Sequence, residues 1–316
     1  MTTASDVVCF GELLWDFFEA DKGTYSRHLG GASANTAVAL GRLGIASAAA
    51  GGVGDDKLGE ALKAQLAEAG VDTTHVVKVK GARTGITFVS RDGTGEPSFV
   101  PYRNGTADVS IGEDKVTAAM AKARFVVVGS TALLPSARAA TEKLLAAADK
   151  AKAAIVFDLN ARPHLWPDAD ALRAACKELA KRAVLLKASE KDLGAIAGKR
   201  GLSWLDENAK QATWILTRGE NGAACVGAHG QSTAPTKRVR CIDATGAGDA
   251  FLGGVLAVLV RADAKPGSAA WKDGKLWTRA METGHQVAAK VVAHVGATTG
   301  LANVDDIRAR MDAKKG

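Results

Sequence analysis

The chain has few cysteines, no strong excess of charge of either sign and no long apolar run. Its four cysteines are far apart in 316 residues, which excludes a disulfide framework and CxxC metal motifs. No stretch approaches the roughly 18 consecutive apolar residues of a membrane-spanning helix. The first residues include acids and no basic-then-apolar leader, so we expect no secretory signal. We therefore expect a cytoplasmic protein with free thiols and no membrane partner.

Basic residues only slightly outnumber acidic ones, at 41 Lys and Arg against 34 Asp and Glu. They are scattered, and the chain lacks a basic patch interleaved with aromatic residues, so nucleic acid is not an expected partner. A formal net charge of +7 suits an anionic substrate. The length and the hydrophobic fraction of 47% predict one large α/β domain, which we place over residues 1–316.

Short β-type runs alternate with alanine-rich helical runs over most of the chain. This alternation predicts an α/β fold whose mostly parallel sheet is covered by helices on both faces. The expected strands are Val7–Phe10, Ala48–Gly52, Phe125–Val128, Ala154–Asp158, Ala183–Lys187 and Thr213–Thr217. The expected helices lie near residues 34–43, 57–69, 136–152, 168–182, 189–197, 246–261 and 275–293. Ligands of such folds bind in loops beyond the carboxyl ends of the strands.

Two segments interrupt the alternation. Residues 12–29 follow the first strand without a helical pattern, and residues 84–102 indicate a hairpin with its turn at 91–95. Extended segments outside the alternation need a sheet of their own in which to pair. We therefore predict a small β-sheet lid over the strand ends, formed by residues 12–29 and 82–106.

Residues 243–254 read Asp-Ala-Thr-Gly-Ala-Gly-Asp-Ala-Phe-Leu-Gly-Gly and carry the strongest chemical signal. Glycines at a helix start let free N–H groups face an anion, and the helix dipole adds to the attraction. A carboxylate beside such a site, here Asp249, is suited to deprotonate a hydroxyl that attacks phosphorus. A dinucleotide-binding turn is the alternative, but Phe251 stands where that motif requires its third glycine.

A second glycine motif opens the run at residues 30–44, which begins Gly-Gly-Ala-Ser-Ala-Asn. The glycine pair exposes backbone amides, and Asn35 adds a side chain that both donates and accepts hydrogen bonds. These groups suit sugar hydroxyls. A plain helix N-terminus capped by Ser33 explains the motif equally well when it is taken alone.

Together, the runs at 30–44 and 243–254 resemble the two diagnostic motifs of the ribokinase/PfkB family of carbohydrate kinases. Further segments similar to family blocks are found at 11–16, 51–56, 102–108, 158–163, 187–190 and 217–222. The first, third and fourth of these most resemble fructokinases. The resemblance implies a Rossmann-like three-layer α/β sandwich, the ribokinase-like fold, with a small β-sheet lid.

The resemblance also implies transfer of the γ-phosphoryl group of ATP to a sugar hydroxyl, with ATP and Mg²⁺ as cofactors. On the matching positions, Asp249 is the catalytic base, and the backbone amides of Gly246, Ala247 and Gly248 form the anion hole with that of Asp249. Such a transfer depends mostly on positioning and charge stabilisation, so it needs no covalent nucleophile.

The sugar site that the resemblance implies is formed by Asp16, Gly31, Asn35, Arg103, Asn160 and Arg162. Asp16 corresponds to an acid that holds sugar hydroxyls, and the aromatic neighbours Trp15 and Phe17 favour a partly buried position over a surface turn. Arg103, at the close of the hairpin, would hold the sugar or its developing phosphate, because a planar guanidinium suits oxygen ligands.

The implied nucleotide site is formed by Lys187, Glu190, Thr217, Gly219, Gly222 and His285, with Gly296 and Ala297 beside the adenine. Glu190 stands where the family orders Mg²⁺ through water. Lys187 stands where the family usually has Asn and could contact an ATP phosphate. The loop Asp243–Thr245 resembles a monovalent-cation loop, which leaves potassium as a further possible cofactor.

Fructose is the expected sugar, and a 2-keto-3-deoxygluconate kinase is the main alternative within the family. Such kinases tend to carry a further aromatic hydroxyl just before the Tyr-Arg pair. This chain has Val100 and Pro101 there, before Tyr102, which argues against that alternative. Ribose fits less well, because the first block lacks an Asn-x-Asp pattern, and other sugars and nucleosides stay open. The partners expected are therefore a small sugar and ATP.

Two alternatives belong to other classes. A catalytically silent sugar- or nucleotide-binding protein would show damage at the base or the anion hole, yet Asp249 and both glycines are intact. A NAD-linked dehydrogenase depends only on the glycine pattern. Exposed lid strands are natural pairing edges, so we also expect a homodimer formed through the lid.

Overall fold

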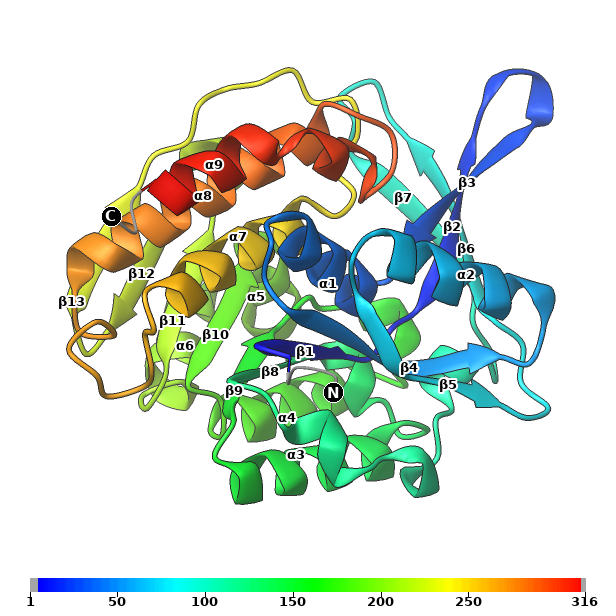
Figure 1. Cartoon of the computed structure of the whole chain (residues 1–316), viewed down its shortest axis with the longest axis horizontal. Coiled ribbons are helices and arrows are strands. Elements are labelled where there is room, and N and C mark those ends of the chain that lie inside the picture. The colour runs from blue at the N-terminus through cyan, green and yellow to red at the C-terminus, as the bar shows by residue number, and fades with distance from the viewer. Residues whose placement is uncertain (1–4, 314–316) are drawn as a thin grey trace.

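The computed structural model describes residues 5–313 and contains a large sheet and a separate small sheet (Figure 1). Within these residues the large sheet has nine strands in the order β13-β12-β11-β10-β9-β8-β1-β4-β5. Pairing is parallel from β5 through β11, whereas β12 and β13 are antiparallel. The strands are β1 (Val7–Phe10), β4 (Ser47–Gly54), β5 (Asp72–Val79), β8 (Phe125–Gly129), β9 (Ala154–Asp158), β10 (Leu185–Ser189), β11 (Thr213–Thr217), β12 (Ala223–Gly227) and β13 (Gly230–Ala234).

Helices cover both faces of the large sheet. They are α1 (Ala32–Arg42), α2 (Lys57–Glu68), α3 (Arg138–Ala151), α4 (Ala169–Ala180), α5 (Glu190–Ala197), α6 (Gly201–Asn208), α7 (Ala247–Arg261), α8 (Gly274–Val292) and α9 (Asp305–Ala313). Short 3-10 helices lie in the connections, at Asp21–Gly23, Ala107–Val109, Glu113–Lys115, Ala118–Ala121, Ser130–Leu133, Pro163–Leu165, Gly198–Arg200, Gly219–Asn221 and Thr299–Asn303.

The two faces of the sheet have separate hydrophobic cores. Alternate residues of a strand point to opposite sides, so Val7 and Cys9 of β1 join the core under α1, α2, α7 and α8. Val8 and Phe10 join the core under α3, α4, α5 and α6. The fold is therefore a three-layer α/β sandwich, which confirms the predicted class.

The small sheet is built from the two segments that interrupt the alternation. Its strands are β2 (Leu14–Glu19), β3 (Tyr25–Gly30), β6 (Gly85–Arg91) and β7 (Pro97–Tyr102), in the order β3-β2-β6-β7. Asp16, Thr87 and Pro101 are aligned neighbours across three strands, so they share one face of this sheet. In Figure 1 the small sheet lies beside α1 and α2, at one side of the molecule.

The main differences from the expected elements lie at the edges of the large sheet. The strand expected at Ala183–Lys187 is β10, which begins two residues later because its pairing with β11 starts at Leu185. Strands β5, β12 and β13 and helices α6 and α9 were not predicted. β5 contains mostly polar residues and is only partly buried. β12 and β13 are short and rich in small residues. None of the three strands shows the apolar run of a buried strand.

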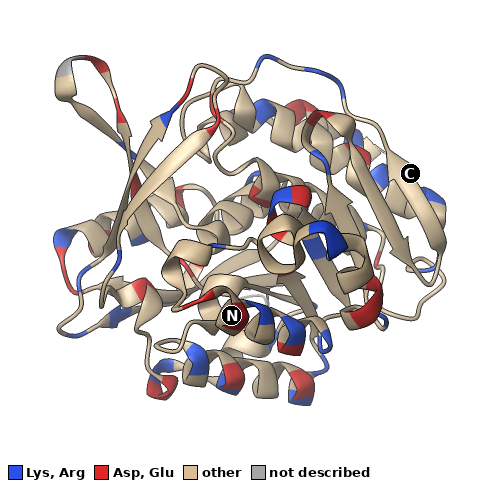
Figure 2. Ribbon diagram, turned by 180° about the vertical axis from the view of Figure 1, so that it is seen from behind, with Lys and Arg blue, Asp and Glu red and all other residues tan. Residues whose placement is uncertain are grey.

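Charged residues of both signs are interspersed on the outer helices (Figure 2). For example, Arg138 of α3 pairs with Glu142 of α3 and with Glu178 of α4, and Arg182, just after α4, pairs with Glu142. In the part of the chain that the structure describes, no helix combines the length and apolar character needed to cross a bilayer.

Candidate active site

The N-terminus of α7 is shaped by two glycines. Gly246 caps the helix at φ +76°, and a Cβ there would lie 2.4 Å from the Cβ of Ala297. A Cβ on Gly248 would lie 2.7 Å from the Nζ of Lys187. The N–H groups of Gly248 and Asp249 lie in the first turn, where no carbonyl of the helix can accept from them. The Ala247 N–H, by contrast, donates to the Ala244 carbonyl at 3.2 Å.

Asp249 and Asn35 bring the two glycine motifs together. The Nδ2 of Asn35, on α1, donates to Oδ2 of Asp249 at 2.9 Å, and both side chains are buried. The helices can approach because Gly253 of α7 faces Ala39 of α1, where a Cβ would leave only 2.6 Å. Burial raises the pKa of the Asp249 carboxyl above its ordinary value, opposed by the positive charge of Lys187. Asp249 is thus a carboxylate suited to accept a proton.

A cavity lies between the small sheet and the starts of α1 and α7. It is lined by Glu12, Leu14, Asp16, Gly31, Ala32, Asn35, Thr87, Phe99, Pro101, Arg103, Arg162, His164, Thr245, Gly246 and Asp249. The structure therefore gathers the implied sugar-site residues Asp16, Gly31, Asn35, Arg103 and Arg162 around one cavity together with Asp249. Asn160 of that set does not line it.

Asp16 is only 5% exposed and packs directly against Gly30, where a Cβ would lie 2.3 Å from its Oδ2. Burial, with the negative charge of Glu12 beside it, raises the pKa of Asp16 to about 8. A buried carboxyl of this kind gains from hydroxyl donors, since they replace the water that burial removed.

Arg103 is held between two carboxylates. Its Nη1 donates to Oε1 of Glu12 at 2.7 Å and its Nε donates to Oδ2 of Asp108 at 2.8 Å. Burial opposes ionisation of Glu12, but the Arg103 guanidinium outweighs it and lowers the pKa of Glu12 to about 2. The other oxygen of Glu12 accepts from the Ala32 N–H at 3.2 Å. This cluster therefore ties the end of β7 to the loop after β1 and to the start of α1.

Lys187 lies beneath the start of α7. Its Nζ lies 3.0 Å from Oδ1 of Asp158, and both side chains are about 4% exposed. Burial raises the pKa of Asp158 to about 7, although Lys187 acts in the opposite direction. Since Nζ also lies close to Gly248, Lys187 adds positive charge beside the free amides of α7.

Two residues of the implied sugar site remain. Asn160 contributes through its backbone, and Arg162 forms part of the cavity wall. Asn160 adopts φ +36°, and its carbonyl accepts from the hydroxyl of Ser130 at 2.9 Å. Arg162 donates to the Ala161 carbonyl at 3.0 Å, and its guanidinium carbon lies 5.9 Å from the centre of the Phe99 ring.

None of the implied nucleotide residues lines the cavity; Lys187 is in β10, His285 is on α8, and the others lie at the ends of β10 and β11 or just beyond them. Glu190 is exposed at the start of α5. Thr217 ends β11, and Gly219 and Gly222 take positive φ in the turn to β12. His285, on α8, lies 5.0 Å from the ring of Phe251, and burial lowers its pKa.

Asp243 is fully buried and organises the loop before α7. Its Oδ1 accepts from the N–H and the hydroxyl of Thr245 at 2.9 and 2.6 Å, and its Oδ2 accepts from the Gly296 N–H at 2.7 Å. Its carboxylate therefore connects the two loops that meet at Gly246. Within residues 5–313, no group of three or more His, Cys, Asp or Glu side chains is arranged to hold a metal ion.

Several residues of the site were not singled out from the sequence, namely Glu12, Thr87, Phe99, Asp108, Asp158 and His164. Glu12, Asp108 and Asp158 stand inside the blocks that resemble the family, which is the signal that could have found them. Their partners lie on other elements, so their roles depend on the fold.

Comparisons with known proteins identify relatives of this chain. A family model described as pfkB family carbohydrate kinase matches residues 4–303. Fructokinase-1 of Zea mays is 32% identical over 271 residues, which are 81% of this chain and 83% of the relative. The fructokinase of Vibrio cholerae with fructose, ADP and calcium bound has a TM-score of 0.87 at 28% identity, covering 97% of this chain and 98% of that one.

A second structural relative has a different printed substrate. The aminoimidazole riboside kinase of Salmonella enterica, complexed with aminoimidazole riboside and an ATP analogue, has a TM-score of 0.83 at 26% identity and covers 96% of this chain and 99% of that one. The resemblance noted in the sequence is thus confirmed, and the chain belongs to the pfkB family of carbohydrate kinases.

Proposed function

We propose that the protein is an ATP-dependent fructokinase that uses Asp249 as its catalytic base. The observation that carries the proposal is that Asp249, at the glycine-shaped start of α7, lines the same cavity as Asp16, Asn35 and Arg103. The carboxylate would take the proton of the attacking sugar hydroxyl as the oxygen bonds to the γ-phosphorus. The bond from that phosphorus to the bridging oxygen breaks, and ADP leaves with the electron pair.

The chain's own groups can stabilise the charge of this transfer. The free N–H groups of Gly248 and Asp249 and the α7 dipole favour negative charge at the helix start. Lys187 lies just below them. Asn35 orients the base by donating to one of its oxygens and leaves its own buried Oδ1 without a partner in the described residues.

Magnesium bound to the ATP phosphates would neutralise their charge. Glu190 fits the assignment of an acid that holds such an ion through water, because its carboxylate is exposed at a strand end and makes no ion pair within residues 5–313. The Asp243–Thr245 loop is proposed as a potassium site, supported by the structure of a double mutant of Vibrio cholerae fructokinase with fructose, ADP and potassium bound.

Fructose is favoured by the relatives that are named fructokinases and by the charge of the cavity. Arg103, which a sugar acid would need for its carboxylate, is already paired with Glu12 and Asp108. A neutral sugar suits this cavity better than an anion, because the Glu12 carboxylate in its wall stays negatively charged and like charges would repel. This favours fructose over 2-keto-3-deoxygluconate.

An ADP-release screen tests the function. Purified protein with ATP and Mg²⁺ is offered fructose, tagatose, ribose, 2-keto-3-deoxygluconate and nucleosides. The highest kcat/KM is expected with fructose. Binding of sugar and ATP without ADP release from any acceptor would instead indicate a silent binding protein, and a higher kcat/KM with a nucleoside would overturn the fructose assignment.

We further propose that the small sheet is a lid and that a second copy packs on its outer face. Across the strands, Tyr25 and Tyr102 lie edge-on against Phe88, and they are 49% and 61% exposed. Exposed aromatic and apolar side chains on one sheet face are typical of an interface. Light scattering should give a dimer mass, and Tyr102→Glu should shift it to the monomer; a monomeric wild type would contradict the interface.

A further inference from the structure

Asp158 and Lys187 form a buried ion pair beneath the start of α7. They are aligned neighbours at the ends of the parallel strands β9 and β10. Val156 and Leu185, two residues earlier on these strands, belong to the core under α1, α2, α7 and α8. Side chains two positions apart on a strand point to the same face. The carboxylate and the ammonium group therefore meet on the face of the sheet that α7 covers.

The pair is closely enclosed. The Nζ of Lys187 lies 3.0 and 3.4 Å from the two oxygens of Asp158, and both side chains are about 4% exposed. Replacing a buried ion pair by apolar residues of similar volume often leaves stability unchanged or higher. Stability by itself therefore does not account for the two charges.

Lys187 also acts on Asp249. Its Nζ approaches α7 at Gly248, where a Cβ would lie only 2.7 Å away, and Asp249 is the next residue. Burial opposes the charge of Lys187, but nearby carboxylates, Asp158 foremost, outweigh burial and raise its pKa. Burial raises the pKa of Asp158 and of Asp249, and Lys187 opposes the rise in both. One ammonium group thus serves two carboxyl groups, Asp158 by contact and Asp249 through its charge.

Other ionisable groups face this centre from several elements. Asp192 of α5 is engaged by three donors, since it accepts from the Ala161 N–H at 2.8 Å and from the N–H and hydroxyl of Ser189 at 2.8 and 2.7 Å. The remaining groups that interact with Asp249 through charge are Glu12, Arg162, Asp16 of β2 and Cys9 of β1. All of them are retained in the variants below, so a difference between variants reports on the ion pair.

We propose that Asp158 is a positioning residue for phosphoryl transfer: it draws the Lys187 ammonium group beneath Gly248 and shares its charge with Asp249. Asp158 does not line the cavity, so it acts through Lys187. The inference rests on the proposed role of Asp249 as the base. Without Asp158, the charge of Lys187 acts on Asp249 alone, which then holds a proton less readily. Without Lys187, Asp249 holds a proton more readily.

NMR of the aspartate carboxyl groups tests the pair without turnover. The protein is isotope-labelled at the carboxyl carbons of aspartate, and the Asp249 signal is identified by its absence from Asp249→Asn. Asp158→Asn should move the titration midpoint of Asp249 about one pH unit lower, and Lys187→Gln should move it about one pH unit higher. Asn at position 158 still offers an oxygen to Lys187, so the first variant changes charge more than shape.

A double variant keeps the test decisive if a single variant fails to fold. Asp158→Asn combined with Lys187→Gln leaves neither charge of the pair, and its Asp249 midpoint should lie above that of wild type because the ammonium group is absent.

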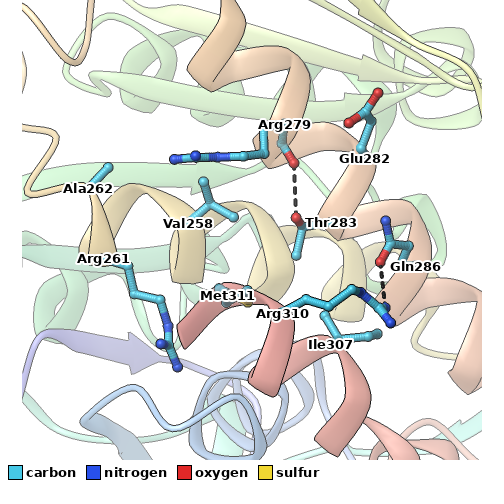
Figure 3. A pocket seen from close by; sticks show the side chains of 10 residues that line it. All are labelled: Val258, Arg261, Ala262, Arg279, Glu282, Thr283, Gln286, Ile307, Arg310 and Met311. Carbon is cyan, nitrogen blue, oxygen red and sulfur yellow. Dashed lines mark hydrogen bonds between the residues drawn. The ribbon is translucent and has the colours of Figure 1, made fainter. Parts of the chain in front are cut away.

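Two control variants remove a charge of each sign elsewhere and should leave the midpoint unchanged. Asp55→Asn breaks a pair with Lys78 in which both side chains are half exposed. Arg279→Gln changes a cavity that α7 lines at its other end with Arg261 (Figure 3). Asp249 and Arg261 are separated by about 18 Å along the helix.

Kinetics separates this inference from the proposed function. The acid limb of kcat/KM for ATP, measured by ADP release at saturating sugar, should shift in the same directions as the NMR midpoints. An unmoved midpoint in Asp158→Asn or in the double variant, shifts of one sign in the two single variants, or an acid limb that does not follow the midpoint would overturn the inference. Midpoints that shift as expected in a protein that releases no ADP with any sugar would count against the proposed function and not against the action of the pair on Asp249.

Discussion

The two buried ion clusters of the candidate site balance their charges differently. On the sugar side, Arg103 lies between Glu12 and Asp108, so its guanidinium is engaged on two sides. On the phosphoryl side, Lys187 pairs with Asp158, while the Asp249 carboxyl receives only an uncharged amide donor. The first arrangement holds elements in place, whereas the second leaves a carboxyl with a raised pKa that can take up a proton.

The strongest test of this comparison is Asp249→Asn, which keeps the shape but removes the base. We expect kcat to fall at least about 100-fold, the lower limit for losing general-base catalysis, while ATP binding persists. ADP release and nucleotide titration measure the two effects. Asp170→Asn, in the first turn of the distant helix α4, is the matched control. Turnover near the wild-type rate would remove Asp249 from the base role.

Arg103→Gln tests whether the sugar-side cluster is structural. Glu12 and Asp108 would keep their burial and lose their counter-ion, so the free energy of unfolding should fall by about 3 kcal/mol. Urea denaturation measures the change. Arg138→Gln, which breaks partly exposed pairs on α3, should cost less than about 1 kcal/mol. Equal losses in the two variants would show that burial does not set the cluster apart.

Asp16→Asn tests recognition of the sugar. We expect the sugar KM to rise about tenfold, which corresponds to losing one hydrogen bond, with an unchanged KM for ATP. Steady-state kinetics with each substrate varied in turn separates the two. A sugar KM within twofold of wild type would place Asp16 outside the binding site.

The pH dependence of stability gives a smaller, graded test of Asp16. Its pKa is about 8 in the folded protein, against an ordinary value near 3.8, so the folded state retains a proton that the unfolded chain releases. The favourable contribution is present below about pH 4 and is lost as pH rises towards 8. Melting temperatures from pH 4 to 8 should therefore fall less steeply in Asp16→Asn than in wild type. Parallel profiles would contradict a raised pKa.

The smallest effect is expected at the turn between β6 and β7. There Glu96 pairs with Lys191 of α5 at 2.7 Å, but both side chains are more than half exposed. Lys191→Ala should lower the free energy of unfolding by less than about 1 kcal/mol because solvent screens the pair. Thermal unfolding in low and high salt measures it, and a larger loss would mean that the turn is anchored more firmly than its exposure indicates.

Much of the fold could be predicted because its signals are local. The apolar runs of β1 and β9 and the helical periodicity of α2 and α7 are present in consecutive residues, and these elements occur almost where the pattern placed them. The edge strands β5, β12 and β13 could not be predicted in this way. Their residues are polar or small, and pairing with a neighbouring strand rather than apolar burial makes them extended.

The part of the candidate site at the start of α7 could be predicted, because glycines in such a motif point to one physical requirement of the backbone. Gly246 and Gly248 indicate a helix start that must accommodate close neighbours, and the acid at 249 follows from the same motif. Arg103 shows the opposite case. Its type and position suggested contact with a sugar or phosphate, yet only the structure shows that two carboxylates already neutralise it.

The sequence by itself determined the family, the α/β class and the position of the acid at the start of α7, because motif spacing, periodicity and backbone freedom are properties of neighbouring residues. The tertiary structure decided which side chains meet. Asn35 reaches Asp249 across 214 positions of the chain, and Glu12 reaches Arg103 across 91. Such contacts depend on helix packing and strand register, and burial then determines which carboxyl is neutralised and which one can take a proton.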